Sequence, residues 1–213
     1  MSVPTTDRTA TRVHLDELHR YLVEARGSLL WKIDGLDEYD VRRPLTPSGT
    51  NLLGLIKHLT GVELLYLGAC FGRISAHAPG WFGQQSAVRS DFLATAEESR
   101  DQLIQDYRHA CAHADATLAA LPDDAVTHAP WLSPEPLGLH RILVHLVTET
   151  EHHVGHADIV RELIDGSLGR SEAESELDNT GGGDVPDAEG WRHRYEMVET
   201  TARAASGLTA GMR

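Results

Sequence analysis

The stretch from Leu139 to Gly166 constrains the fold of this 213-residue chain more than any other. It contains no proline, it ends in a glycine, and its apolar residues recur every three or four positions. This period is typical of one amphipathic α-helix, which at 1.5 Å per residue would be about 40 Å long. A helix of that length is expected in a helical bundle.

Two polar residues interrupt the apolar face of this predicted helix. At about 100° per residue, His153 lies within about 30° of the centre of the face and Glu149 within about 70°. Burying an unpaired carboxylate costs on the order of several kcal/mol, so Glu149 needs a partner. A metal ion is the partner that best fits a Glu-x-x-x-His pair. His145, His152 and His156 fall near the edge of the face or beyond it.

Three further segments show the same helical period. The expected helices run from Val13 to Leu36, from Asn51 to Gly72 and from Glu97 to Leu121. Prolines lie in the connections between them, and no stretch shows sustained strand-like alternation. The sequence therefore predicts an all-α fold, an antiparallel four-helix bundle over residues 1–166.

Residues 167–213 are expected to form a flexible tether and a short C-terminal helix. The tether, residues 167–188, is rich in Ser, Glu and Gly and contains three consecutive glycines. The helix follows in the run AEGWRHRYEMVETTARAAS, where Trp191, Tyr195 and Val198 form a narrow apolar stripe. We expect this helix to pack on the bundle.

The second predicted helix supplies a third polar candidate. His58 lies about 60° from the centre of its apolar side, where a lone histidine is more often a hydrogen-bonded core residue than a ligand. With Glu149 and His153 available across a bundle, a metal site becomes the better interpretation. Three protein ligands leave a coordination position open, as in catalytic zinc sites. Zinc is the first choice of metal, and nickel, iron or manganese would accept the same ligands.

A long connection, residues 74–96, has no sustained period and contains Trp81 and Phe82. Loops of this length are often binding lids, so we expect a substrate pocket to open beneath it. Trp81 and Tyr66 are the expected lining residues. His156 is the expected partner of a metal ligand, although His156 or His145 as a fourth ligand would indicate a purely structural site.

Composition limits the partners and the compartment. With 19 Lys and Arg against 32 Asp and Glu, the formal charge is −13, which argues against nucleic-acid binding. The first residues are polar, so neither a signal peptide nor a membrane anchor is expected. Cys70 and Cys111 match no metal or redox motif and indicate reduced thiols in a cytoplasmic protein. We expect a monomer or a homodimer.

Three runs of sequence resemble the DinB-like superfamily, and within it the branch related to mycothiol S-transferases. They are LLWKIDGLDEYDVRRPLTPSGTNLLGLIKHLTGVE, ILVHLVTETEHHVGHADIVRELIDG and WRHRY. The resemblance implies a four-helix bundle that holds a divalent metal between helices, usually through three histidines. Glu149 departs from that pattern, and similarity to mycothiol-dependent maleylpyruvate isomerase implies the ligand set His58, Glu149 and His153.

The resemblance also implies an enzyme that conjugates a low-molecular-weight thiol, mycothiol in the first place, to an electrophilic small molecule. A metal with an open position lowers the pKa of a bound thiol. Two alternatives stay open: a metal-dependent hydrolase or isomerase of the same fold, and a non-catalytic, stress-linked metal-binding protein. A funnel lined by Trp81 or Tyr66 would favour the transferase, whereas a fourth protein ligand would favour the structural role.

Overall fold

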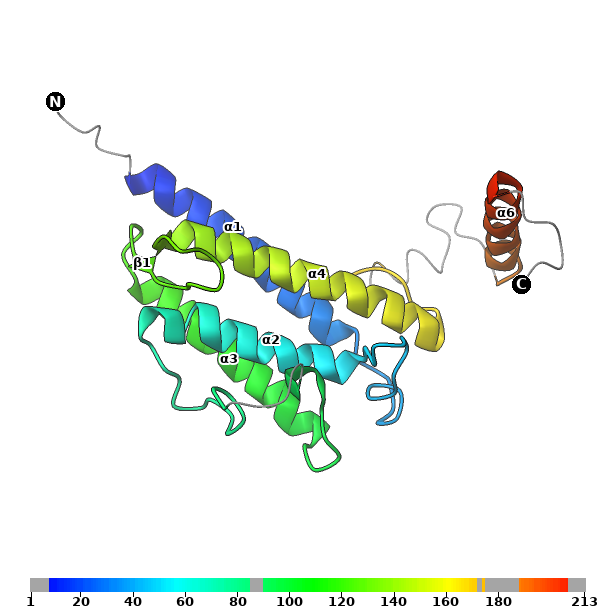
Figure 1. Cartoon of the computed structure of the whole chain (residues 1–213), viewed down its shortest axis with the longest axis horizontal. Helices are drawn as coiled ribbons and strands as arrows, with labels where there is room; N and C mark the ends of the chain where they lie inside the picture. Colours follow the sequence, from blue (N-terminus) through cyan, green and yellow to red (C-terminus); the bar gives the residue numbers. More distant parts are fainter. Residues whose placement is uncertain (1–7, 85–89, 172–173, 175–187, 207–213) are drawn as a thin grey trace. The chain divides into compact units, whose positions relative to one another are not determined.

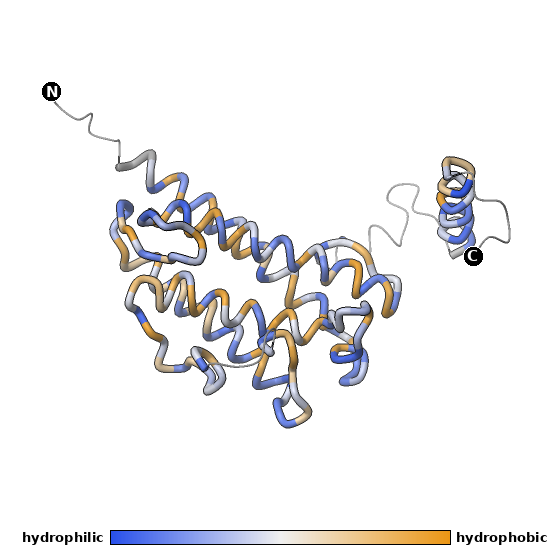
Figure 2. The backbone as a smooth tube through the Cα atoms, in the orientation of Figure 1, coloured by the Kyte–Doolittle hydropathy of each residue, from blue (hydrophilic) through white to orange (hydrophobic). Residues whose placement is uncertain are grey.

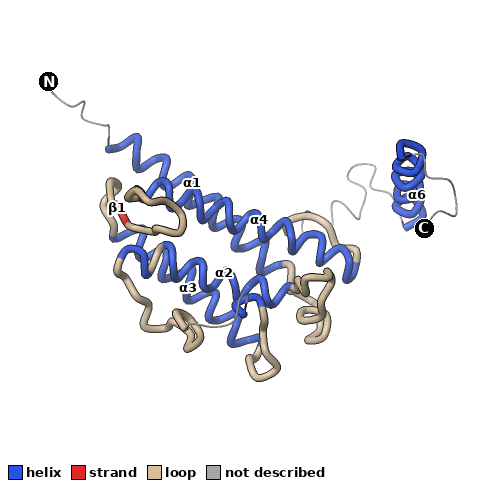
Figure 3. Tube along the Cα trace, in the orientation of Figure 1, coloured by secondary structure: helices blue, strands red, loops and turns tan. Residues whose placement is uncertain are grey.

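The computed structural model describes residues 8–84, 90–171, 174 and 188–206, and the chain forms two compact units, Met1–Arg170 and Ser171–Arg213. The predicted all-α fold is confirmed (Figures 1 and 3). The first unit contains the helices α1 Arg8–Trp31, α2 Leu52–Tyr66, α3 Arg100–Ala120 and α4 Leu139–Asp165, together with two 3-10 helices, η1 Ala69–Phe71 and η2 Ser90–Phe92.

The four long helices of the first unit enclose one apolar core. Helix α1 packs along α4, and α2 packs against both α3 and α4. Hydrophobic residues recur along all four helices in Figure 2. Burying one such leucine or isoleucine stabilises the fold by about 1.5–3 kcal/mol relative to its exposed state. Core residues that are no more than 1% exposed include Leu22, Leu55, Leu59, Ile142 and Leu146.

Helix α4 has the bounds that its sequence predicts. It begins at Leu139 and ends at Asp165, and Gly166 follows in the left-handed conformation at φ 80°. Glycine takes this conformation without the steric cost that a Cβ brings, and it commonly ends a helix. Helix α3 begins later than predicted, at Arg100, because Ser99 accepts a hydrogen bond from the backbone N–H of Gln102 and caps it.

Helix α2 begins as predicted and ends early. Asn51 accepts a hydrogen bond from the backbone N–H of Gly54 at 2.8 Å and caps the helix. The predicted helix ran to Gly72, but α2 ends at Tyr66 and the chain turns into η1. At Gly68 the backbone passes so close to Leu64 that a Cβ there would lie 2.2 Å from the Leu64 carbonyl oxygen.

Helix α1 also ends before its predicted limit, at Trp31 rather than Leu36. Arg161 of α4 covers this end, because its Nη1 atom donates to the carbonyl oxygens of Lys32 at 3.0 Å and Asp34 at 2.9 Å. A cation suits this place, since the last carbonyls of a helix lack partners within the helix. The capping residue comes from α4, so the sequence around α1 could not reveal it.

Two short strands in the connection between α3 and α4 were not predicted. β1 (Val126–Thr127) pairs antiparallel with β2 (Leu137–Gly138), with Val126 opposite Gly138 and Thr127 opposite Leu137. Strands of two residues are too short to show an alternating pattern in sequence.

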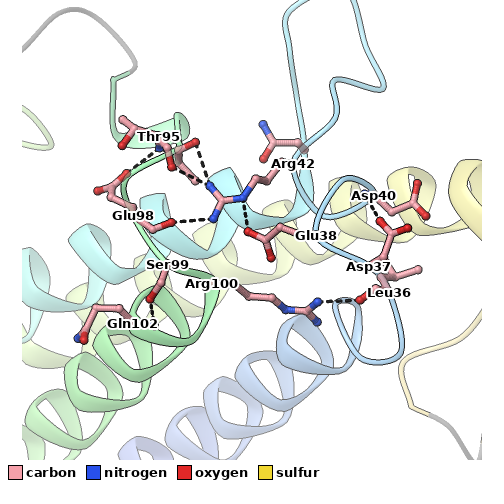
Figure 4. Close-up of polar contacts among 12 residues, drawn as sticks. Leu36, Asp37, Glu38, Asp40, Arg42, Thr95, Glu98, Ser99, Arg100 and Gln102 are labelled. Carbon is pink, nitrogen blue, oxygen red and sulfur yellow. Dashed lines mark hydrogen bonds and ion pairs between the residues drawn. The ribbon is translucent and has the colours of Figure 1, made fainter.

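Two arginines join the loop after α1 to the start of α3 and the segment before it (Figure 4). Arg42 donates to the carbonyl oxygens of Thr95 at 2.8 Å and Glu98 at 2.7 Å, and Arg100 donates to that of Leu36 at 2.7 Å. In each bond an arginine side chain donates to a main-chain carbonyl oxygen, so the bonds satisfy backbone acceptors outside the helices. They fix the end of the 74–96 connection, in which η2 lies.

The second unit contains α6, Ala188–Ser206, which spans the residues predicted for the C-terminal helix. Its packing on the bundle stays a prediction. The predicted tether lies largely outside the described residues. Within the described part of the chain, the stretch Leu52–Phe71 is long and apolar enough to cross a membrane, but 78% of that window is buried, as in the core helix of a soluble protein.

Candidate metal centre

His58 of α2 meets Glu149 and His153 of α4 between the two helices. One ligand atom from each residue lies within 4.8 Å of the others. The Nε2 atoms of His58 and His153 lie 3.4 Å and 3.3 Å from the same carboxylate oxygen, Oε1 of Glu149. The four-residue spacing places Glu149 and His153 one above the other on α4, on the side that packs against α2.

Burial and mutual contact set the protonation of this cluster. Burial, and then the proximity of His58, lower the pKa of His153 from its ordinary 6.5 to about 4. Partial burial alone would raise the pKa of Glu149, but the hydrogen bond with His58 and the interaction with His153 outweigh it, and the pKa falls below 4.5. At neutral pH Glu149 is therefore a carboxylate beside the neutral imidazole of His153, and these are the forms that bind metals.

The donor set fits a divalent metal. In the described part of the chain, Glu149 makes its ion-pair contacts with two imidazoles and not with lysine or arginine. Two imidazole nitrogens and one carboxylate oxygen are ligands that zinc and its neighbours among the transition metals accept. A cation between these atoms would supply the positive charge that the half-buried carboxylate lacks.

His145 and His156 lie close to the cluster without completing it. The Nδ1 atom of His156 is 3.3 Å from Nδ1 of His153, on the ring edge that faces away from Glu149. The ring of His145 packs edge-on against Tyr66, with the centroids 4.6 Å apart. Among the described residues the donor group contains three side chains, and neither of these histidines is a fourth member.

Asp91 contacts the cluster from outside, and the sequence analysis did not find it. Its Oδ2 atom lies 2.6 Å from Nδ1 of His58. Its neighbour Phe92 stacks on the His58 ring, with centroids 3.9 Å apart and planes inclined by 17°. Both residues belong to η2, and a helix of three residues has no period that a sequence could show.

A cavity of about 460 Å³ lies beneath the 74–96 connection, where the sequence predicts a pocket. Trp81 lines it together with His58 and Asp91. Tyr66 does not line it, and its hydroxyl instead accepts a hydrogen bond from Trp131 Nε1 at 3.2 Å. Of the three candidate ligands only His58 lines this cavity.

Comparison with known proteins places the chain in a family. The model of the family described as Mycothiol-S-transferase matches residues 17–166. The chain belongs to this family. The mycothiol S-transferase family is DinB-like, so the predicted DinB-like four-helix bundle is confirmed. The match includes most of α1, all of α2 to α4, and the three candidate ligands. Comparisons with curated proteins and with solved structures found no match.

Proposed function

We propose that the protein is a metal-dependent S-transferase that joins a low-molecular-weight thiol, mycothiol in the first place, to an electrophilic small molecule. The observation that carries this proposal is the three-donor cluster of His58, Glu149 and His153, which has no fourth protein ligand among the described residues. Three protein ligands leave a position for an exogenous one. Membership of the mycothiol S-transferase family supplies the class of thiol.

The chain's own side chains prepare the cluster for this role. Nε2 of His58, Nε2 of His153 and the carboxylate of Glu149 would hold a divalent cation, zinc by preference. The cation would supply Lewis acidity, which lowers the pKa of a thiol that joins it. The low pKa of His153 keeps its lone pair available at neutral pH. His156 contacts Nδ1 of His153 and would fix the orientation of that ring.

The cavity beneath the 74–96 connection suits the electrophile. Val62, Leu65, Trp81 and Phe82 give it an apolar lining, and it reaches the donor cluster at His58. In the transfer, the thiol gives its proton to solvent and its sulfur forms a bond to the electrophilic carbon. The leaving group departs with its electron pair or, in a conjugated acceptor, the neighbouring carbon takes up a proton.

We also propose that the protein acts in the cytoplasm, in detoxification. Cys70 and Cys111 are both free thiols, as a reducing compartment keeps them. Burial raises the pKa of each of them, so neither thiol competes as a nucleophile with the small-molecule substrate.

The test is conjugation to a fluorogenic electrophile. Zinc-loaded protein is incubated with monochlorobimane and, in separate reactions, with mycothiol, bacillithiol, glutathione or cysteine. We expect turnover with mycothiol that a chelator removes and that Glu149→Ala abolishes. Glu162→Ala, at an exposed glutamate of the same helix, is the matched control and should keep the activity. If no thiol reacts faster with the protein than without it, the transferase proposal is wrong, and the hydrolase, isomerase and non-catalytic alternatives gain.

A further inference from the structure

The segment that carries Asp91 is fastened closely to α2. Only glycine fits at Gly54, because a Cβ there would lie 2.1 Å from the carbonyl oxygen of Phe92. One turn further along, the Nζ atom of Lys57 donates to the carbonyl oxygen of Leu93 at 2.9 Å. Both contacts are made by the two residues that directly follow Asp91, so they hold the end of η2 close to α2.

Both ring nitrogens of His58 face carboxylates. Asp91 Oδ2 lies 2.6 Å from Nδ1, and Glu149 Oε1 lies 3.4 Å from Nε2. An ionised carboxylate can only accept a hydrogen bond, so the shorter contact requires a proton on Nδ1. In the neutral imidazole the lone pair is then on Nε2, on the side of Glu149 and His153.

We propose that Asp91 is the positioning residue of the metal centre, holding His58 as the Nδ1–H tautomer with Nε2 directed at Glu149 and His153. This inference rests on the proposed metal site and extends it to a residue outside the donor cluster. A carboxylate behind a ligating imidazole fixes the orientation of the ring and makes its other nitrogen a stronger donor. Because Asp91 also lines the cavity, this hydrogen bond links a residue of the cavity wall to a candidate metal ligand.

The first readout is zinc affinity, measured on the full-length protein by competition with a chromophoric chelator. Loss of an outer carboxylate typically weakens metal binding about 10–100-fold, and we expect a loss of that size for Asp91→Ala. Asp91→Asn keeps an acceptor oxygen without the charge, so it should lie between Asp91→Ala and the wild type. Asp124→Asn, at an exposed aspartate outside the cluster, should bind zinc as the wild type does.

The second readout does not depend on activity. In zinc-loaded, ¹⁵N-labelled protein, the Nδ1–H proton of His58 should give a downfield resonance that exchanges slowly with water. We expect Asp91→Ala to lose this resonance and Asp91→Asn to keep it at a shifted position. With zinc on Nε2 the ring proton is on Nδ1 in every variant, so the resonance reports whether the side chain at position 91 accepts that proton and protects it from water.

Lys57→Met separates positioning from loop anchoring, because it removes the bonds to Leu93 and Glu98 and leaves the close approach at Gly54 and the carboxylate of Asp91 unchanged. We expect a lower melting temperature with unchanged zinc affinity. The inference is wrong if Lys57→Met weakens zinc binding as much as Asp91→Ala does, or if Asp91→Ala leaves both readouts unchanged. A wild-type protein that binds no zinc would overturn the metal centre as well. Zinc binding that depends on Asp91, without thiol turnover, would overturn the transferase alone.

Discussion

Two polar clusters lie inside this bundle, and they differ in what neutralises their carboxylates. In the first, Arg26 of α1 donates to both oxygens of Glu63 on α2, at 2.6 Å and 2.7 Å, and Glu63 is 0% exposed. In the second, one oxygen of Glu149 faces His58 and His153 at 3.4 Å and 3.3 Å, and the Glu149 side chain is 31% exposed.

This difference shows in which cluster a charged side chain neutralises the carboxylate. A guanidinium stays charged at every physiological pH and binds a carboxylate through two parallel hydrogen bonds, so Arg26 and Glu63 satisfy each other. The imidazole of His153 is neutral at neutral pH, and its contact with Glu149 is longer than a good hydrogen bond. The first cluster braces α1 against α2, whereas in the second the described ion-pair partners of the carboxylate are two histidines and not lysine or arginine.

The largest loss of stability is expected when the ion pair between Arg26 and Glu63 is broken. Glu63→Ala leaves the buried guanidinium of Arg26 without its main partner, and this should reduce the free energy of unfolding by about 3–5 kcal/mol. Urea unfolding of the metal-free protein measures the loss. The double variant Arg26→Met/Glu63→Leu removes both charges and should lose less than the single variant. A loss of under about 1 kcal/mol for Glu63→Ala, the size seen for exposed pairs, would contradict the comparison.

Zinc bound between His58, Glu149 and His153 should stabilise the fold. At a zinc concentration about 100 times its Kd, the stability gain is expected to be about 2.7 kcal/mol, seen as a higher melting temperature. His58→Ala should remove the gain, and His140→Ala, at an exposed histidine of α4, should keep it. Elemental analysis of protein made without an affinity tag checks the metal content. If His58→Ala retains the metal of the wild type, this ligand assignment is wrong.

The helical period of the sequence was enough to predict the fold and the three candidate metal ligands, but not the residues around those ligands. Glu149 and His153 could be found because a helix face is a local property, repeated along α4 and ended by Gly166. Arg26 is different, since its pairing with Glu63 depends on how two helices meet. Asp91 lies in a three-residue helix whose place depends on the close approach that Gly54 allows. Such contacts are tertiary and leave no pattern along the chain.

A pH-dependent effect is expected from the second cluster in the metal-free protein. The pKa of His153 is lowered to about 4 in the folded state, so between about pH 6.5 and 4 the unfolded chain binds a proton that the folded chain does not. Stability must therefore fall as the pH falls through this window. The lowered pKa of Glu149 acts in the same direction, because its stabilisation is present above pH 4.5 and is lost below it.

The measurement is the urea midpoint as a function of pH, with a chelator present. His153→Gln should flatten the curve between about pH 6.5 and 4, since glutamine does not titrate. Glu162→Ala serves as the control and should follow the wild type. A His153→Gln curve that runs parallel to that of the wild type would show that His153 does not carry the slope.

The smallest loss of stability is expected at Asp115, at the exposed edge of the Arg26–Glu63 cluster. Asp115 of α3 accepts a hydrogen bond from Nη1 of Arg26 at 2.7 Å, and its side chain is 40% exposed. Water can replace much of what is lost there, so Asp115→Asn should cost about 0.2–1 kcal/mol in urea unfolding, far less than Glu63→Ala. Asp124→Asn provides the baseline for a change of surface charge. If Asp115→Asn costs as much as Glu63→Ala, exposure does not decide how strongly these carboxylates depend on their partners. The 31% exposure of Glu149 would then not indicate how strongly that carboxylate depends on a partner.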